Sequence, residues 1–151
     1  MIKNINTLFV TMFGLGKIPK IPGTFGSLAT VILLYIFFHI LNFSQIIIFL
    51  FLIVIFFFSF IAVAIYIRDN TNKDPKEVVI DEFIGQSIPI ILFEIFHGDR
   101  NYSAYEALQI YFWFFLLFRV FDGLKPFPID YVDKKFKNTF GILFDDILAG
   151  L

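Results

Sequence analysis

Five carboxylates stand beside strongly apolar residues in three separate stretches of the chain. They are Asp81 and Glu82 in VVIDEFIG, Asp122 in FRVFDGLKP, and Asp145 and Asp146 in GILFDDILAG. Ionised groups among apolar side chains need water, a counter-ion or a metal to offset the cost of losing solvent. Carboxylate oxygens are hard ligands that suit Mg²⁺, so the five acids are candidate metal ligands and candidate acid/base groups.

Two basic residues flank the middle carboxylate. Arg119 and Lys125 stand on either side of Asp122, and cations of this kind bind phosphate. Carboxylates, cations and Mg²⁺ together are what the hydrolysis of a phosphate ester uses. Two simpler interpretations stay open from these residues alone. Arg119 and Asp122 are three apart and could form an ordinary ion pair, and acids in the first turn of a helix suit its dipole.

Other catalytic chemistries have less support in the sequence. The chain has no cysteine, which excludes thiolate nucleophiles, thiolate metal sites and disulfides. Thr24, Ser27 and Thr139 have no obvious base to activate them. The net charge of -1 gives no reason to expect a nucleic acid as partner. A mixed stretch of acids and lysines is interpreted as the solvated face of an amphipathic helix and is assigned no role: Asp130, Asp133, Lys134, Lys135 and Lys137.

Long apolar runs must position the candidate site. The chain is 58% hydrophobic and only 17% charged, which indicates a helical membrane protein. Residues 45–67 carry no charge and exceed the roughly 20 residues that cross a bilayer. We expect an all-α, polytopic fold in a single domain (residues 1–151), with about four membrane-embedded helices at 28–41, 45–67, 83–96 and 106–120 plus cytoplasmic helices and loops. The first two should form a hairpin across a polar turn at 42–44.

The N-terminal part holds a glycine- and proline-rich stretch, GLGKIPKIPGTFGSLAT, over residues 14–30. This composition predicts an ordered loop that becomes a helix near Gly26–Ser27, with Ser27 as the N-cap. The free N–H groups of such a helix start can bind an anion. A plain connector before a membrane helix is the alternative. The apolar run before this stretch is broken and has no small-residue cleavage site, so a signal peptide is not expected.

The distribution of basic residues predicts an orientation. With four crossings, one side holds all but one of the 12 basic residues: Lys3, Lys17, Lys20, Arg68, Lys73, Lys76, Arg119, Lys125, Lys134, Lys135 and Lys137. Only Arg100 falls on the other side, together with both histidines, His39 and His97. Positive residues concentrate in the cytoplasm. The same division places all five candidate acids on the cytoplasmic face.

Four blocks of the chain together resemble the phosphatidylglycerophosphatase A family of bacterial membrane phosphatases. The blocks are IPGTFGSLAT, VVIDEFIG, FRVFDGLKPFPI and GILFDDILAG, and they occur in the family's order. The resemblance implies an all-helical enzyme of the bacterial cytoplasmic (inner) membrane. It also implies a Mg²⁺-dependent hydrolysis of the lipid phosphatidylglycerophosphate to phosphatidylglycerol and phosphate.

The same resemblance assigns roles to residues. Asp81, Glu82, Asp122, Asp145 and Asp146 become metal and acid/base residues, Arg119 and Lys125 phosphate-holding residues, and Gly23 and Thr24 part of a second phosphate cradle. The chain departs from the family pattern in the turn at 138–141 and in the loop at 74–77. Relatives commonly continue past the last block into another apolar segment, so the last helix here is expected to be short.

One function of another class remains as an alternative. A small transporter or channel subunit could bind ions through buried acids, and it predicts acids inside the spans near the bilayer midplane. The five candidate acids fall instead at the cytoplasmic ends of the apolar runs, which favours the phosphatase. The sequence leaves open the number of metal ions, the identity of the base, a covalent aspartyl-phosphate and the oligomeric state.

Overall fold

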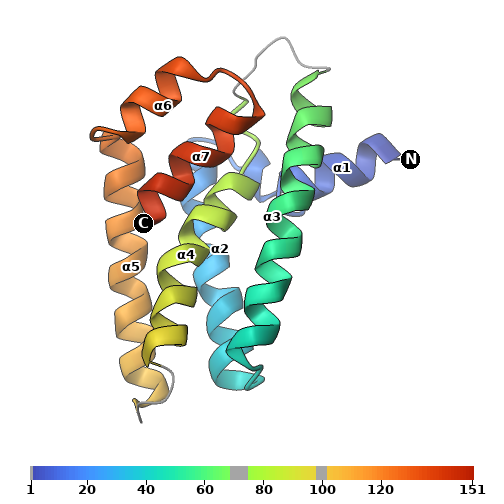
Figure 1. Cartoon of the computed structure of the whole chain (residues 1–151). Helices are drawn as coiled ribbons and strands as arrows, with labels where there is room; N and C mark the ends of the chain where they lie inside the picture. Colours follow the sequence, from blue (N-terminus) through green and yellow to red (C-terminus); the bar gives the residue numbers. More distant parts are fainter. Residues whose placement is uncertain (1, 69–74, 98–101) are drawn as a thin grey trace.

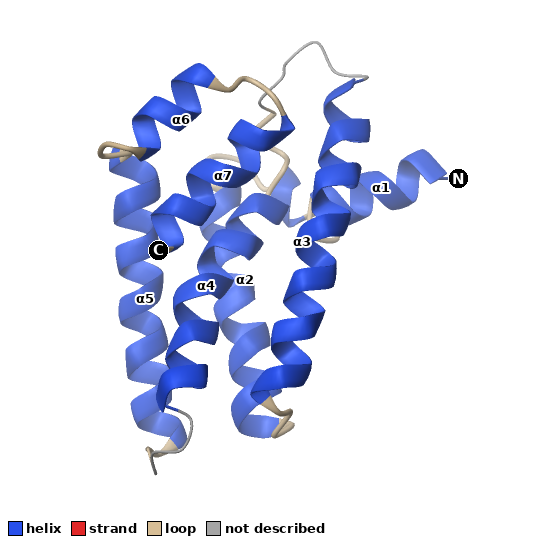
Figure 2. Ribbon diagram, in the orientation of Figure 1, coloured by secondary structure: helices blue, strands red, loops and turns tan. Residues whose placement is uncertain are grey.

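The computed structural model describes residues 2–68, 75–97 and 102–151, and every regular element in these ranges is helical. Figure 2 shows the helices and the loops that join them. The elements are α1 (Ile2–Val10), the short 3-10 turn η1 (Leu15–Lys17), α2 (Pro22–Tyr35), its π-helical extension η2 (Ile36–Ile40), α3 (Gln45–Arg68), α4 (Ile80–His97), α5 (Ala104–Leu124), α6 (Ile129–Lys135) and α7 (Thr139–Gly150).

Helices α2, α3, α4 and α5 run side by side as a bundle, and the shorter helices gather at one end of it (Figure 1). There, α7 lies across α4 and contacts α3 and α5 as well, while α6 packs on α7. The start of α2, the start of α4 and the end of α5 reach the same end. This arrangement brings the three acidic stretches and the glycine-rich stretch of the sequence together.

Three helical segments are long and apolar enough to cross a membrane: Pro22–Ile40, Gln45–Arg68 and Ala104–Leu124. Many of their large apolar side chains face outward, for example Ile46 at 72% exposed and Phe57 at 64%. Such a surface is expected where the surroundings are lipid. The protein is therefore a helical membrane protein. Helix α4 corresponds to the remaining expected span, 83–96. It lies among the other three helices but carries Asp81, Glu82 and Glu94.

Helix α2 begins earlier than the sequence predicted. Its first residue is Pro22 rather than Gly26 or Ser27, and Ser27 lies inside the helix, where its hydroxyl donates to the Gly23 carbonyl over 2.9 Å. The prediction was wrong because proline is well suited to a first helical turn, where its missing N–H has no partner to lose. Ser27 is consequently not an N-cap.

The predicted turns are largely confirmed. Residues 41–44 separate η2 from α3, with Asn42 in the left-handed region at φ 53°. Helix α5 ends at Leu124, before Pro126, and Lys125 closes it with φ 43° and an N–H that donates to the Phe121 carbonyl. A proline disfavours helix at the residue before it, which explains this end. Lys73, Asp74 and Arg100, which entered the charge argument and the family comparison, lie outside the described residues.

Two glycines let α4 and α7 approach closely. A Cβ on Gly150 would lie 2.2 Å from the Gly85 carbonyl oxygen, and one on Gly85 would lie 2.5 Å from the Asp146 carbonyl oxygen. Neither position can hold a larger residue without movement of backbone. The close crossing sets Asp146 beside the first turn of α4. Around it, a packed cluster that includes Phe83, Ile142 and Leu143 joins α4 and α7 to α3.

Candidate active site

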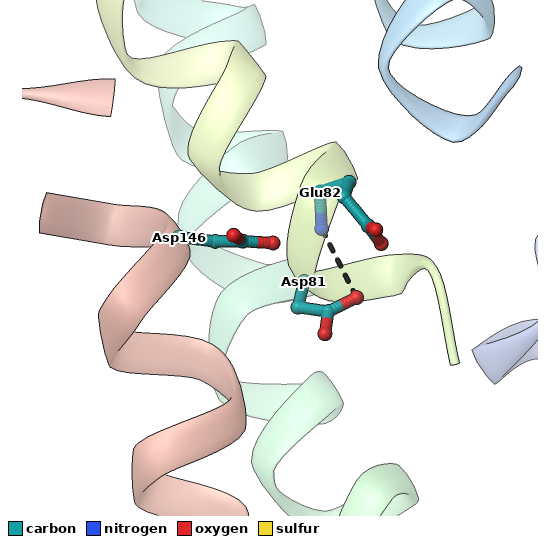
Figure 3. A group of neighbouring side chains, drawn as sticks. All are labelled: Asp81, Glu82 and Asp146. Atoms are coloured by element: carbon teal, nitrogen blue, oxygen red, sulfur yellow. Dashed lines mark hydrogen bonds between the residues drawn. The ribbon is translucent and has the colours of Figure 1, made fainter. Parts of the chain in front are cut away.

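Asp81, Glu82 and Asp146 form the centre of the candidate site. Each offers one carboxylate oxygen, and these three oxygens all lie within 4.8 Å of one another. Figure 3 shows the three side chains together, Asp81 and Glu82 from the start of α4 and Asp146 from α7. The Glu82 backbone N–H donates to Asp81 Oδ1 over 3.1 Å and so orients that carboxylate. Three carboxylates at this spacing can share one cation.

A cavity of about 330 Å³ opens beside these carboxylates. Every residue that the sequence analysis placed in the site lines this cavity: Gly23, Thr24, Asp81, Glu82, Arg119, Asp122, Lys125, Asp145 and Asp146. The residues come from α2, α4, α5, α7 and the residue after α5. The structure therefore brings together a set that the sequence spreads over more than a hundred positions.

Lys125 lies on the α7 side of the cavity. Its Nζ is 2.7 Å from Asp145 Oδ2 and 3.3 Å from Asp133 Oδ1. Asp145 is only 9% exposed, so its ion pair with Lys125 is the better shielded of the two. The two acids hold the ammonium group in place at the cavity wall, where it can meet an anion.

Arg119 joins α5 to α2 at another wall of the cavity. Its Nη2 is 2.9 Å from Asp122 Oδ2, and its Nη1 donates to Ser27 Oγ over 3.1 Å. The ion pair between Arg119 and Asp122 is the one that their spacing of three residues predicted. Ser27 is fully buried, and its hydroxyl donates a hydrogen bond to the Gly23 carbonyl, so its oxygen is fixed to accept from the guanidinium.

In the cavity wall formed by α2, the absence of a side chain at Gly23 leaves room for the Glu82 carboxylate. A Cβ on Gly23 would lie 1.9 Å from Glu82 Oε1 and 3.4 Å from Arg119 Nη1. The Glu82 carboxylate therefore occupies the space that any other side chain would need. The glycine-rich stretch thus contributes close contact with the acids, and the phosphate cradle at Gly23 and Thr24 stays a prediction.

Burial and mutual repulsion raise the pKa values of the central acids, all of which precede or lie outside the apolar spans. The pKa of Asp81 and of Asp146 is raised well above the usual value, first by loss of solvent and then by the neighbouring carboxylates, with Glu82 the largest contributor in both cases. Burial also raises the pKa of Glu82. A bound cation would reverse this effect, because it favours the ionised form of each ligand.

The pKa values of Lys125 and Asp145 depend on their ion pair as well as on burial. Burial raises the pKa of Asp145, and the hydrogen bond and charge of Lys125 oppose that rise. Burial lowers the pKa of Lys125, but the hydrogen bond with Asp145 and the charges of Asp145 and Asp133 outweigh it, so the net change is upward. Lys125 therefore stays positively charged at neutral pH.

Some residues of the cavity were missed by the sequence analysis. Asp133 was assigned to a solvated helix face, yet its carboxylate lies against Lys125 and lines the cavity. Its neighbour Asp130 fits the expectation, since it pairs with Lys134 on the exposed side of α6. Lys20, Lys76 and Lys137 also line the cavity and add positive charge. The spacing of Asp133 and Lys137 gave only the signal of a surface ion pair.

A second polar cluster lies at the opposite end of the bundle. Glu94 of α4 is 4% exposed and accepts hydrogen bonds of 2.7 Å from the hydroxyls of Tyr102 and Tyr111. His39 Nε2 is 3.4 Å from Glu94 Oε1. The sequence analysis did not single out Glu94, although it interrupts an apolar run. Its hydrogen bonds join α4 to Tyr111 of α5 and to Tyr102 just before α5, and these two donors satisfy its oxygens.

The fold and the site define a class: a helical membrane protein with carboxylates and fixed cations around one polar cavity at the end of its bundle. The comparison with protein families shows which family within that class the chain belongs to. The family model described as phosphatidylglycerophosphatase A matches residues 8–151, and the chain belongs to that family. The resemblance drawn from four sequence blocks is thereby confirmed.

Three relatives support this assignment. The chain is 35% identical to "Phosphatidylglycerophosphatase A" of Haemophilus influenzae, over 95% of this chain and 81% of that protein. It is 30% identical to the Escherichia coli protein of the same name, over 95% of this chain and 76% of that one. It is also 32% identical to a Bacteroides thetaiotaomicron protein named "Putative phosphatidylinositol-3-phosphatase", over 95% and 86%. No solved structure matches the chain.

Proposed function

We propose that this protein hydrolyses the terminal phosphomonoester of phosphatidylglycerophosphate and releases phosphatidylglycerol and phosphate. The observation that carries the proposal is the cavity in which Asp81, Glu82 and Asp146 face Lys125 and Arg119. Carboxylates that can hold a cation, next to fixed positive charges, suit a phosphate dianion. Family membership and the names of two relatives support this substrate.

We propose Mg²⁺ as the cofactor, held by Asp81, Glu82 and Asp146. The donor set fits, since all three donors are carboxylate oxygens, which Mg²⁺ prefers. A further observation supports the fit: Glu82 Oε2 is buried and has no hydrogen-bond partner among the described residues. A buried, unpaired carboxylate oxygen is costly unless something positive offsets it. When bound, the ion would neutralise phosphate charge and make a water molecule more acidic.

The residues of the chain have separate tasks in the proposed reaction. Lys125 and Arg119 hold the phosphate oxygens, and Asp145, Asp133, Asp122 and Ser27 fix those two cations in place. A water oxygen forms the new bond to phosphorus while the bond to the glycerol oxygen breaks. A carboxylate of the cluster accepts the proton that the water loses, and the same carboxyl group then gives a proton to the departing glycerol oxygen.

We further propose that the protein lies in the inner membrane and that its cavity opens on the cytoplasmic side. Lys20, Lys76 and Lys137 line the cavity. Lys17 lies in η1, which packs on α2, and Lys134 lies in α6, which packs on α7. A concentration of positive residues favours the cytoplasmic side. The lipid tails would then stay in the bilayer while the phosphate enters the cavity from the membrane surface.

The test is phosphate release by the purified protein in mixed micelles of phosphatidylglycerophosphate. We expect release with Mg²⁺ and none after chelation, restored when Mg²⁺ returns. Phosphatidylinositol 3-phosphate, the lipid implied by the name of the Bacteroides relative, serves as the comparison substrate. No release from phosphatidylglycerophosphate under any metal condition would rule out the proposed function. Faster release from the inositol lipid would move the substrate assignment to that lipid.

A further inference from the structure

An apolar groove runs along the outside of the bundle between α2 and α5. It encloses about 630 Å³. Several of its side chains are half exposed or more, such as Ile32 at 52%, Phe112 at 54% and Trp113 at 61%. The groove is lined mainly by Leu28, Val31, Ile32, Phe112, Trp113 and Phe115.

The groove begins one helical turn from the catalytic cavity on both of its walls. On α2, Thr24 lines the cavity and Leu28 lines the groove. On α5, Arg119 lines the cavity and Phe115 lines the groove. Residues four apart lie on the same face of a helix, one above the other. The apolar groove therefore starts about one helical turn from the polar cavity on both α2 and α5.

Two other apolar hollows each have a deeply buried residue in the wall. The hollow between α3 and α4 has Ile84 in its wall, and Ile84 is 7% exposed within a packed cluster that includes Phe83 and Ile142. The hollow beside the end of α7 has Phe118 in its wall, and Phe118 is 1% exposed and packs against Gly85. By contrast, Leu28 at the head of the α2–α5 groove is 41% exposed.

We propose that the α2–α5 groove binds an acyl chain of the phospholipid whose phosphate occupies the cavity. This inference rests on the proposed function. A lipid phosphate is polar and anionic at one end and apolar at the other. The cavity and the neighbouring groove have the same order, with Arg119 in the cavity wall on the side of the groove. The groove would set the depth of the headgroup and so align its terminal phosphate with the acids.

The groove contains an intrinsic fluorescence probe. Trp113 is the single tryptophan of the chain and lines the groove. It precedes Arg119 by six residues, which corresponds to roughly 9 Å along the helix. A bromine on a bound acyl chain would quench its fluorescence, whereas a lipid held elsewhere would not.

The binding test uses the Asp81→Asn variant in phosphatidylcholine nanodiscs, so that the lipid is not consumed. Phosphatidylglycerophosphate with mid-chain bromines is compared with phosphatidylcholine brominated at the same positions. We expect the brominated phosphate lipid to quench Trp113 at a mole fraction about tenfold lower, a difference of roughly 1.4 kcal/mol in affinity. Equal quenching would show bulk lipid only, and no quenching by either would show a groove covered by another chain. Both results overturn the inference.

A kinetic test blocks the groove with Leu28→Trp and uses Val54→Trp as the matched control. Val54 is 65% exposed on α3 and does not line the groove. We expect Leu28→Trp to raise KM for a long-chain substrate several-fold and to leave hydrolysis of the soluble dibutyryl substrate unchanged. An equal effect on both substrates, or none on either, would contradict the inference. Failure of the unaltered protein to hydrolyse either substrate would instead refute the proposed function.

Discussion

Gly23 of α2 and Glu82 of α4 are in such close contact that a Cβ on the glycine would lie 1.9 Å from Glu82 Oε1. The carboxylate fills the place of a side chain on the neighbouring helix. This contact fixes the distance between the start of α2 and the acids of α4. It also explains why the residue of α2 that meets Glu82 has no side chain.

Replacing this glycine should damage the site and leave the bundle folded. We expect Gly23→Ala to lower phosphate release at least tenfold, because the new methyl group displaces the Glu82 carboxylate from the cluster; small misplacements in an active site have large effects. Gly123→Ala is the control, since a Cβ there meets nothing within 4 Å. Circular dichroism checks the fold of both variants. Normal activity in Gly23→Ala would show that Glu82 has no role.

At the crossing of α4 and α7, an added side chain should lower the stability of the protein. A Cβ on Gly85 would lie 2.5 Å from the Asp146 carbonyl oxygen and 2.7 Å from the Phe118 ring. We expect Gly85→Ala to destabilise the protein by about 1–3 kcal/mol, the usual cost of overpacking a core. Thermal unfolding in detergent measures this, with Gly123→Ala again as the control. An unchanged unfolding temperature would contradict the close packing.

The two acids that hold Lys125 should differ in importance. Asp145 is nearer to the ammonium group and better shielded than Asp133, at 2.7 Å and 9% exposed against 3.3 Å and 25%. We expect Asp133→Asn to reduce phosphate release about tenfold at most and Asp145→Asn to reduce it further. Asp130→Asn, on the exposed side of α6, should have no effect. A larger loss from Asp133→Asn than from Asp145→Asn would reverse this assignment.

Metal binding can be measured without activity. A ligand that binds only the folded protein stabilises it by about 2.7 kcal/mol at a concentration 100 times its Kd. We expect Mg²⁺ to raise the unfolding temperature of the unaltered protein in detergent and to have no such effect on Asp146→Asn. The Asp130→Asn variant should respond like the unaltered protein. Equal stabilisation of all three would place the ion elsewhere.

The polar cluster around Glu94 should affect the stability of the protein and not its catalytic activity. Tyr111 is fully buried and donates a 2.7 Å hydrogen bond to Glu94 Oε1, at the end of the bundle far from the cavity. We expect Tyr111→Phe to cost about 1–2 kcal/mol of unfolding free energy, because it leaves a buried carboxylate oxygen with one partner fewer. Phosphate release per folded molecule should change less than about twofold. Tyr105→Phe, at an exposed position, is the control. A large loss of activity with unchanged stability would join this cluster to the catalytic site.

The sequence predicted which residues line one cavity better than it predicted where the helices that carry them begin. Apolar run length is a strong signal, so α3 and the hairpin it forms with α2 were found, and Pro126 marked the end of α5. The start of α2 was misplaced because proline and glycine were interpreted as loop formers. In the structure, Pro22 opens a helix and Gly23 and Gly26 are buried in it.

Most features that the sequence analysis did not predict depend on contacts between helices. Asp133 and Lys125 are eight residues apart on opposite sides of a turn, and no local pattern shows that α6 folds back so that their side chains meet. The roles of Gly85 and Gly150 depend in the same way on the crossing of two helices. Ser103 is a case where a local signal existed: Ser103 and Glu106 form a capping box at the start of α5, and the pattern of serine followed three residues later by glutamate predicts one.

The central claim is that the acids of three sequence stretches act together on one phosphate. It is tested most directly by phosphate release from phosphatidylglycerophosphate at saturating Mg²⁺, comparing Asp81→Asn, Asp122→Asn and Asp145→Asn with Asp130→Asn. The account predicts a loss of at least about 100-fold in Asp81→Asn, the scale of a lost acid/base or metal-binding group. It predicts losses of at least about tenfold in Asp122→Asn and Asp145→Asn, which fix the phosphate-binding cations, and full activity in Asp130→Asn. Full activity in all of the first three variants would contradict it.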